Sequence, residues 1–389
     1  MEKINDGSAN SQRMYFFDNL KAFIILLMVV FHVALGYTTW DIKWWDVNDI
    51  QKSKLFDLFI LETDVYIMPI MFMIAGYFAS IVLVKKGMAL FWQDKLRRIV
   101  LPWISGVLLI APFISYSIIF SRSNIPPNYF SFWANDFWGA YYQQAHFWFL
   151  GILTLFFILL TFAYKLNLIY FEKPRQTSFP SGWFFPSFAL LTAVPFFVTN
   201  LYFETDTWKT VKFILSMQPV RIGLYFCYFG LGVYAWKNAW FTPDGYNPRL
   251  LPWGTSAIIM LFIFTAYRVT FTLGTDIPVL FKAGHALTFA VFCLTATFGF
   301  IALFQRYFDS HAYLWRRLAA NSYTIYFIHR CVVIPLAYTV QNLQLNIWIK
   351  YMSVSIASIV LSYLIAEYVI NPILFLGKRD DKKSTLIQP

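Results

Sequence analysis

Charged residues are scarce in this 389-residue sequence. Asp, Glu, Lys and Arg together make up 13% of the chain, whereas 59% of it is hydrophobic and 21% is aromatic. Soluble globular domains carry about 25% charged residues, and a soluble chain this apolar would expose hydrophobic surface that it could not cover. The scarcity of charge therefore excludes an ordinary soluble domain and predicts a protein embedded in lipid.

Cysteine is also scarce, and the three cysteines all lie in apolar stretches: Cys227, Cys293 and Cys331. They show no metal-ligand spacing and no obvious disulfide pair, so we interpret them as packing residues and expect no metal. The net charge is +11. Basic loops that face the cytoplasm and anionic lipid account for this charge, so we expect no nucleic-acid partner.

Apolar runs dominate the chain, and about 20 residues suffice to cross the hydrocarbon core of a bilayer. Ten such runs are present, at 17–37, 60–84, 99–120, 147–166, 185–203, 213–236, 251–272, 282–304, 318–341 and 348–375. We find no internal repeat and no cleaved signal peptide. The sequence thus predicts an all-α bundle of about ten transmembrane helices over 17–376, between a cytoplasmic N-terminal segment (1–16) and a basic cytoplasmic tail (377–389).

The orientation follows from the basic residues between the runs. With the N-terminus inside, nineteen Lys and Arg residues fall in cytoplasmic segments and eight in outer segments. This excess follows the positive-inside rule, so both termini are expected in the cytoplasm.

Ionisable residues inside the runs cost about 2.5–3.5 kcal/mol each on insertion scales, and such groups usually face a cavity or one another. Four of them fall in the outer half of the expected bundle, on three different runs: His32, Glu62, Asp64 and His146. A histidine that accepts a proton while a carboxylate orients it is a common general-base arrangement. Each residue alone is equally compatible with a structural role, but together they predict a catalytic site. The other ionisable residues within the runs include Lys21, Arg221, His329, Arg330 and Glu367.

A basic turn, formed by Lys95, Arg97 and Arg98, lies just before the third run on the expected cytoplasmic side. The positive-inside rule explains such a cluster without any ligand. Positive charges beside an aqueous cavity also suit the phosphates of a nucleotide-like donor. Composition alone favours the first interpretation.

Five segments resemble the acyltransferase-3 family of membrane O-acyltransferases, most closely its glucan-succinyltransferase branch. In chain order they are residues 17–32, 72–78 (Phe-Met-Ile-Ala-Gly-Tyr-Phe), 95–102 (Lys-Leu-Arg-Arg, then Leu-Pro), 146–150 (His-Phe-Trp-Phe-Leu) and 321–329 (Asn-Ser-Tyr-Thr-Ile-Tyr-Phe-Ile-His). In the first segment ten residues separate the basic residue, Lys21, from His32, as they do in the family. Ala75 stands where the family usually has serine.

The resemblance implies an enzyme of the bacterial inner or plasma membrane that moves an acyl group from acetyl-CoA or succinyl-CoA to a glycan or related hydroxyl acceptor. It implies that the phosphates of this co-substrate meet the basic turn on the cytoplasmic side. It also implies that His32 acts as general base or carries the acyl group, with Asp64, Glu62 or His146 orienting the imidazole or the acceptor. The residues expected to bind donor or substrate are Lys21, Lys95, Arg97, Arg98, Trp148, Tyr326, His329 and Arg330.

Two alternatives remain open at this point. Internal His, Asp, Glu and Arg residues also suit a proton-coupled transporter of a small solute or glycan precursor, although such proteins typically contain internal repeats. A polysaccharide-export partner without chemistry of its own is less favoured, because a scaffold has little need of costly buried charges.

Overall fold

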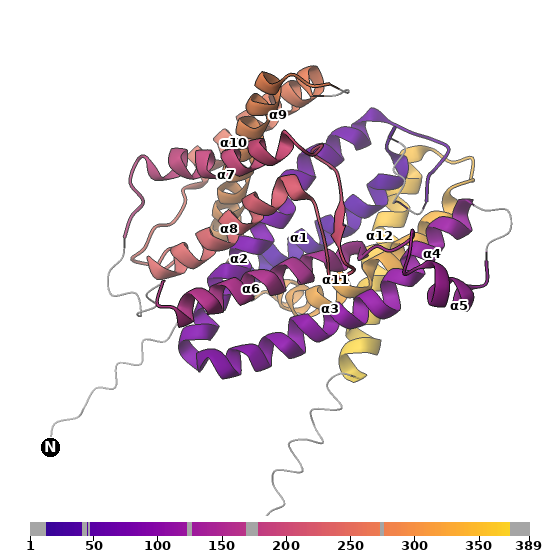
Figure 1. The fold of residues 1–389 in the computed structure, drawn as a ribbon, viewed down its shortest axis with the longest axis horizontal. Helices are drawn as coiled ribbons and strands as arrows, with labels where there is room; N and C mark the ends of the chain where they lie inside the picture. The colour runs from indigo at the N-terminus through magenta and orange to yellow at the C-terminus, as the bar shows by residue number, and fades with distance from the viewer. Residues whose placement is uncertain are drawn as a thin grey trace, which may run out of the picture.

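The computed structural model describes residues 13–40, 45, 47–122, 127–168, 178–272 and 276–373. Figure 1 shows a bundle of α-helices, and the described residues contain one small antiparallel hairpin of strands β1 (Lys209–Val211) and β2 (Leu215–Met217). The expected all-α bundle is confirmed. Most of the expected N-terminal segment, and all of the expected basic tail at 377–389, lie outside the described residues.

The helices follow the apolar runs of the sequence. They are α1 (Tyr15–Ala34), η1 (Leu35–Tyr37), α2 (Lys54–Lys95), η2 (Leu96–Val100), α3 (Leu101–Ser105), η3 (Gly106–Ile110), α4 (Ala111–Arg122), α5 (Tyr129–Ser131), η4 (Phe132–Asp136), η5 (Ala145–Phe147), α6 (Trp148–Lys165), α7 (Phe184–Asn200), α8 (Pro219–Lys237), α9 (Leu250–Phe271), α10 (Val279–Tyr307), α11 (Tyr313–Val340), α12 (Ile347–Ile365) and η6 (Ala366–Ile370). Every expected run overlaps a helix. The sixth begins later than expected, at Pro219, because residues 215–217 form β2 and proline suits the first turn of a helix.

Seven helical stretches among the described residues are long and apolar enough to cross a membrane. One of them, Lys54–Arg122, has 69 residues and contains two of the expected runs. It cannot be a single straight span, because Gly87 has a φ of 76° and breaks the helix. The shorter apolar helix α7 and the helix α8 correspond to two further expected runs. The expected orientation of the termini stays a prediction.

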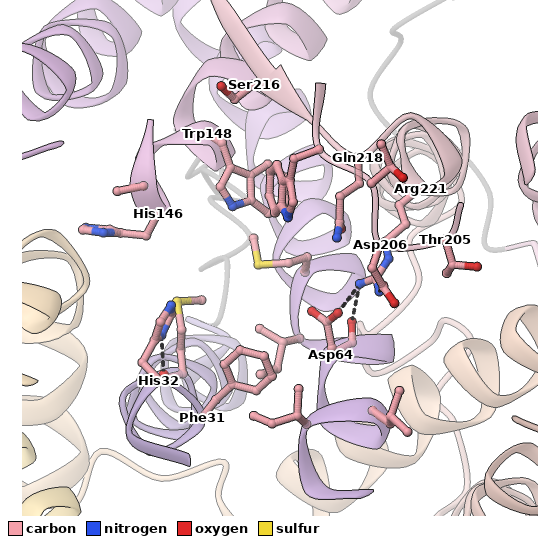
Figure 2. Close-up of a pocket in the computed structure, with 18 of the residues that line it drawn as sticks. Phe31, His32, Asp64, His146, Trp148, Thr205, Asp206, Ser216, Gln218 and Arg221 are labelled. Atoms are coloured by element: carbon pink, nitrogen blue, oxygen red, sulfur yellow. Dashed lines mark hydrogen bonds and ion pairs between the residues drawn. The ribbon is translucent and has the colours of Figure 1, made fainter. Parts of the chain in front are cut away.

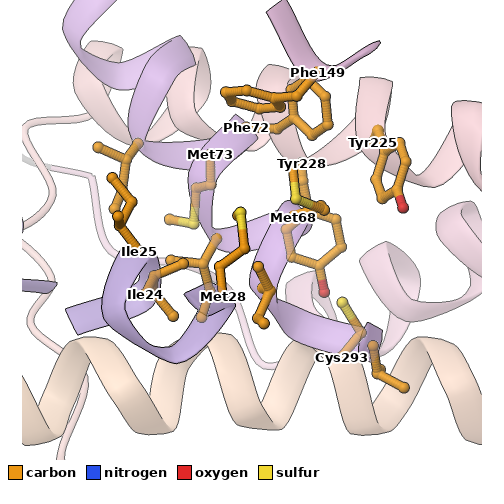
Figure 3. Close-up of a cluster of buried hydrophobic side chains, with 14 of the residues drawn as sticks. Ile24, Ile25, Met28, Met68, Phe72, Met73, Phe149, Tyr225, Tyr228 and Cys293 are labelled. Carbon is orange, nitrogen blue, oxygen red and sulfur yellow. The ribbon is translucent and has the colours of Figure 1, made fainter. Parts of the chain in front are cut away.

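The centre of the bundle is occupied by α1, which contacts α2, α10, α11 and α12 (Figure 1). Buried side chains from α1, α2, α6, α8 and α10 meet there (Figure 3). Three of them are methionines, Met28, Met68 and Met73. Helix α9 lies at the edge of the bundle mainly against α10, and little of it is buried. Its exposed apolar side chains suit a surface that faces lipid.

Helices α2 and α8 approach each other unusually closely through two glycines. A Cβ on Gly76 would lie 2.1 Å from the carbonyl oxygen of Phe229, and a Cβ on Gly232 would lie 2.0 Å from that of Met73. Small residues that let backbones approach are a common means of helix association in membranes. This contact fixes α8 against α2, and both helices line the cavity described below.

We expect Gly232→Ala to destabilise the protein by about 1–3 kcal/mol, because the added methyl group must push the two backbones apart. Gly230 lies on the same helix with nothing within 4 Å of its missing Cβ, so Gly230→Ala is the matched control. Thermal unfolding in detergent measures both. Equal melting temperatures for the two variants would contradict the close contact.

Candidate functional site

A cavity of about 860 Å³ opens among α1, α2, α8, α9, α10, α11, η5 and the β1–β2 region. Two polar groups lie on opposite sides of it. Figure 2 shows His32 and His146 on one side, and Asp64, Asp206 and Arg221 on the other. We call the first set, together with His329, the histidine group.

The histidine group combines three helical elements that are far apart in the sequence: α1 supplies His32, η5 supplies His146 and α11 supplies His329. All three side chains are buried. Nδ1 of His32 lies 2.7 Å from the carbonyl oxygen of Met28 and 3.3 Å from Nε2 of His329. The rings of His146 and His329 are 4.7 Å apart, centroid to centroid.

The hydrogen-bond partners determine which ring nitrogen carries the proton in the neutral histidines. A carbonyl oxygen only accepts, so Nδ1 of His329, which lies 2.7 Å from the Tyr326 carbonyl, must donate. Nε2 of His329 is then an acceptor. Nδ1 of His32 faces that acceptor and the Met28 carbonyl, so it carries the proton. The lone pair of the His32 ring is therefore on Nε2, and His32 lines the cavity.

The segment between η1 and α2, described at residues 45 and 47–53, lies against the histidine group through Trp45. The Trp45 ring lies 5.5 Å from the His32 ring, and the Arg330 guanidinium lies 4.9 Å from the centre of the Trp45 ring. Asp49 attaches this segment to η1, because its backbone amide donates a hydrogen bond of 2.9 Å to the carbonyl of Gly36. The Nζ atom of Lys350 donates to both carboxylate oxygens of Asp49, at 3.0 and 3.1 Å.

The opposite side of the cavity carries alternating charges, which we call the arginine–carboxylate group: Asp64, Asp206, Arg221 and Arg268. Arg221 pairs with Asp64, and also with Asp206 at 2.8 Å, while Arg268 pairs with Asp206 at 3.2 Å. Burial of the Asp206 carboxyl raises its pKa, but the two guanidinium groups oppose this, so the pKa of Asp206 lies below its usual value. The Asp206 carboxylate therefore accepts hydrogen bonds from both guanidinium groups at neutral pH.

Six of the residues predicted for the site line this cavity: His32, Asp64, His146, Trp148, Tyr326 and Arg330. His329 lies directly behind His32, as described above. Tyr326 also donates from its hydroxyl to the carbonyl of His146 at 2.7 Å. Trp148 stacks on Tyr225, with ring centroids 5.8 Å apart. Thus segments near both ends of the chain meet at one site.

Glu62 does not line the cavity. Its carboxylate accepts a hydrogen bond of 2.6 Å from Thr265 Oγ1, which joins α2 to α9. Lys21 lies near the start of α1, with Nζ 2.9 Å from Asp18 and 5.1 Å from the centre of the Phe78 ring. Neither residue reaches the histidine group.

The basic turn lies outside the cavity as well. Lys95 and Arg98 both pair with Asp94, at 3.1 and 3.0 Å, and the Arg98 side chain is 74% exposed. Arg97 lines neither this cavity nor the second one described below. Its role in donor binding stays a prediction.

Sequence reasoning did not select Asp206, Arg268 or His285, all of which line the cavity. Arg268 stood out only as a basic residue near the outer end of a run, and Asp206 lies between two runs. The residues around a charge near the end of a run do not indicate which distant residue it pairs with. In the described residues, no group of three or more His, Cys, Asp or Glu side chains is placed to hold a metal ion.

The comparisons with known proteins agree on one family. The sequence matches the family described as "Acyltransferase domain" over residues 14–367. Proteins named Glucans biosynthesis protein C from Salmonella paratyphi B, Salmonella heidelberg and Salmonella enteritidis are each 26% identical to it over 176 residues. This stretch is 45% of the chain and 44% of each relative, so less than half of the relatives' length is matched. No solved structure matches.

We expect Asp49→Asn to cost about 3–5 kcal/mol of stability, because it leaves the fully buried ammonium of Lys350 without its counter-charge. Adding Lys350→Met should recover part of that loss, since no unpaired charge then remains. Asp18→Asn, which affects the more exposed pairs with Arg13 and Lys21, is the control and should cost under about 1 kcal/mol. Melting temperatures in detergent distinguish these cases. A double variant that is less stable than Asp49→Asn alone would contradict the pairing.

Proposed function

Because the chain belongs to the acyltransferase domain family, and is a membrane acyltransferase, we propose that it moves an acetyl or succinyl group from cytoplasmic acyl-CoA to a glycan hydroxyl at the outer face. The observation that carries this proposal is the position of His32 at the cavity, with Nδ1 held by the Met28 carbonyl and by His329. We place the enzyme in the inner or plasma membrane of a bacterium. Family membership favours acyl transfer over the transporter alternative.

The proposed reaction begins when Nε2 of His32 removes the proton from the acceptor hydroxyl. The oxygen attacks the thioester carbonyl carbon, the carbon–sulfur bond breaks, and the proton passes from His32 to the leaving thiolate. The products are the O-acyl ester and free coenzyme A, so atoms and charge balance. Transfer through an acyl group carried on Nε2 of His32 uses the same geometry. A thioester is already activated, so the reaction needs no metal.

The arginine–carboxylate group suits the acceptor better than it suits His32. Asp64 is paired with Arg221 on the far side of the cavity, so we assign it to hydrogen bonds with acceptor hydroxyls rather than to orienting the imidazole. Aromatic rings of Trp148 and Trp208 lie 5.4 Å apart at the same cavity and offer apolar faces. Carboxylates beside aromatic faces form a surface that suits a polyhydroxylated ligand.

The donor has to reach His32 from the cytoplasmic side in this proposal. The buried methionines Met28, Met68 and Met73 lie together between α1 and α2 (Figure 3), and Met28 and Met68 also line the cavity. Unbranched methionine side chains change rotamer at low cost, so this is where we propose that the acyl end of the donor passes. The phosphates are assigned to Lys95, Arg97 and Arg98 at the cytoplasmic surface.

We expect His32→Ala to lower acyl transfer by about 10²–10⁴-fold, the usual contribution of general acid–base catalysis. The assay follows labelled acetyl or succinyl groups from the CoA thioester into glycans of isolated membranes. His311→Ala, at an exposed histidine outside the cavity, is the control and should keep full activity. Undiminished turnover by His32→Ala would refute the mechanism.

His329 is a positioning residue in this mechanism, because its Nε2 helps the Met28 carbonyl to hold Nδ1 of His32, and His329 does not line the cavity. We expect His329→Phe to lower kcat roughly tenfold, which corresponds to one hydrogen bond of about 1.4 kcal/mol, and to leave KM unchanged. His329→Gln keeps a hydrogen-bond acceptor and should restore part of kcat. Equal kcat values for the Phe and Gln variants would show that His329 serves only packing.

A further inference from the structure

A second cavity, of about 930 Å³, lies at the end of the bundle that is expected to face the cytoplasm. The start of α1, the connection between α8 and α9, the first turn of α9 and the end of α10 surround it. Nothing in the proposed acyl transfer uses it. Three arginines line it, Arg13, Arg249 and Arg306, and Asp309 is its acidic member.

Two of these arginines have no carboxylate partner within the described part of the chain. Arg13 pairs with Asp18 at 3.0 Å, and Asp309 accepts a hydrogen bond of 3.0 Å from the amide of Phe16. Arg249 makes no ion pair with any described residue. The Arg306 guanidinium lies near the ring of its neighbour Tyr307 and makes no ion pair with a described residue either. Two guanidinium groups at one cavity therefore remain available to an anionic ligand.

Backbone dipoles add to this positive potential. Residues 249–252, at the start of the 22-residue helix α9, all line the cavity. The amides of Leu250 and Leu251 belong to the first turn of this helix, where amide groups lack partners within the helix and the helix dipole is positive. Gln305 and Asn247 line the same cavity and are joined to each other by a hydrogen bond of 2.9 Å.

The same cavity is bordered by apolar surface. Leu251 lines it and is 77% exposed, and it begins the helix whose outer side carries Ile258, Ile259 and Phe262, all more than half exposed. A ligand held here by the arginines would place its remainder along α9. A free phosphate would leave this apolar surface unused, whereas the acyl chains of a lipid would cover it.

We propose that this cavity binds the phosphate group of an anionic phospholipid from the cytoplasmic leaflet, through Arg249 and Arg306, with the acyl chains against α9. The site is independent of the acyl-transfer proposal, because it shares no residue with the cavity that holds His32. It joins the start of α1 to α9 and α10, so a bound lipid should stabilise the folded bundle.

The test measures the melting temperature of purified, delipidated protein in detergent while phosphatidylglycerol or phosphatidylcholine is added. Phosphatidylglycerol should raise the melting temperature in a saturable way, and phosphatidylcholine should not. Arg249→Gln with Arg306→Gln should weaken the apparent affinity for phosphatidylglycerol at least about tenfold. Lys237→Gln with Arg316→Gln removes the same charge from exposed positions outside the cavity, on the expected cytoplasmic side, and should keep the response.

Three results would overturn the proposal. The first is an equal response to the two lipids, and the second is an equal loss in the two double variants. The third is a rise in melting temperature with coenzyme A alone that the Arg249 and Arg306 substitutions abolish, because the cavity would then belong to the donor. If the double variant does not fold, the single variants Arg249→Gln and Arg306→Gln are compared by native mass spectrometry. They should retain fewer phosphatidylglycerol molecules than Arg316→Gln.

Discussion

Charges inside this bundle have to find partners within the protein, because neither lipid nor the packed core offers water to solvate them. The pair between Asp49 and Lys350 joins residues 301 positions apart. Arg221 joins α8 to α2 and to the segment before β1, and Arg317 on α11 pairs with Glu367 in η6. These ion pairs connect the helices. They fix the rotation of each helix about its own axis, which apolar contacts alone would leave less well defined.

The same constraint separates the two sides of the cavity. The carboxylates Asp64 and Asp206 are committed to arginines, so no carboxylate of this group is left to pair with the His32 ring. His32 is instead positioned by a main-chain carbonyl and by a second neutral imidazole. Hydrogen bonds, and not an opposite charge, therefore hold the His32 ring in place. In the proposed mechanism, no carboxylate would stabilise the protonated ring, which favours transfer of its proton to the leaving thiolate.

The sequence was sufficient for the helices, because ten apolar runs of membrane length leave little else for the backbone to form. It also selected His32, Asp64 and His146, which line the same cavity, and their catalytic roles stay predictions. It did not distinguish Glu62 from Asp64, which are two positions apart on α2 and therefore face different directions. Only the arrangement of neighbouring helices shows that Asp64 pairs with Arg221 at the cavity, while Glu62 accepts a hydrogen bond from Thr265 on α9. The ion-pair partners of Lys350 and Arg268 could not be predicted from the sequence either, because each partner lies on a distant part of the chain.

The peripheral position of α9 has a consequence for the membrane around the protein. This helix contacts the bundle mainly through α10, yet it carries Arg268 into the arginine–carboxylate group. A bilayer thicker or thinner than the apolar length of a helix favours a change in its tilt, and a loosely held helix responds first. A change in bilayer thickness would therefore tilt α9 and shift Arg268 at the polar side of the cavity. The lipid composition of the host membrane would in this way influence the site.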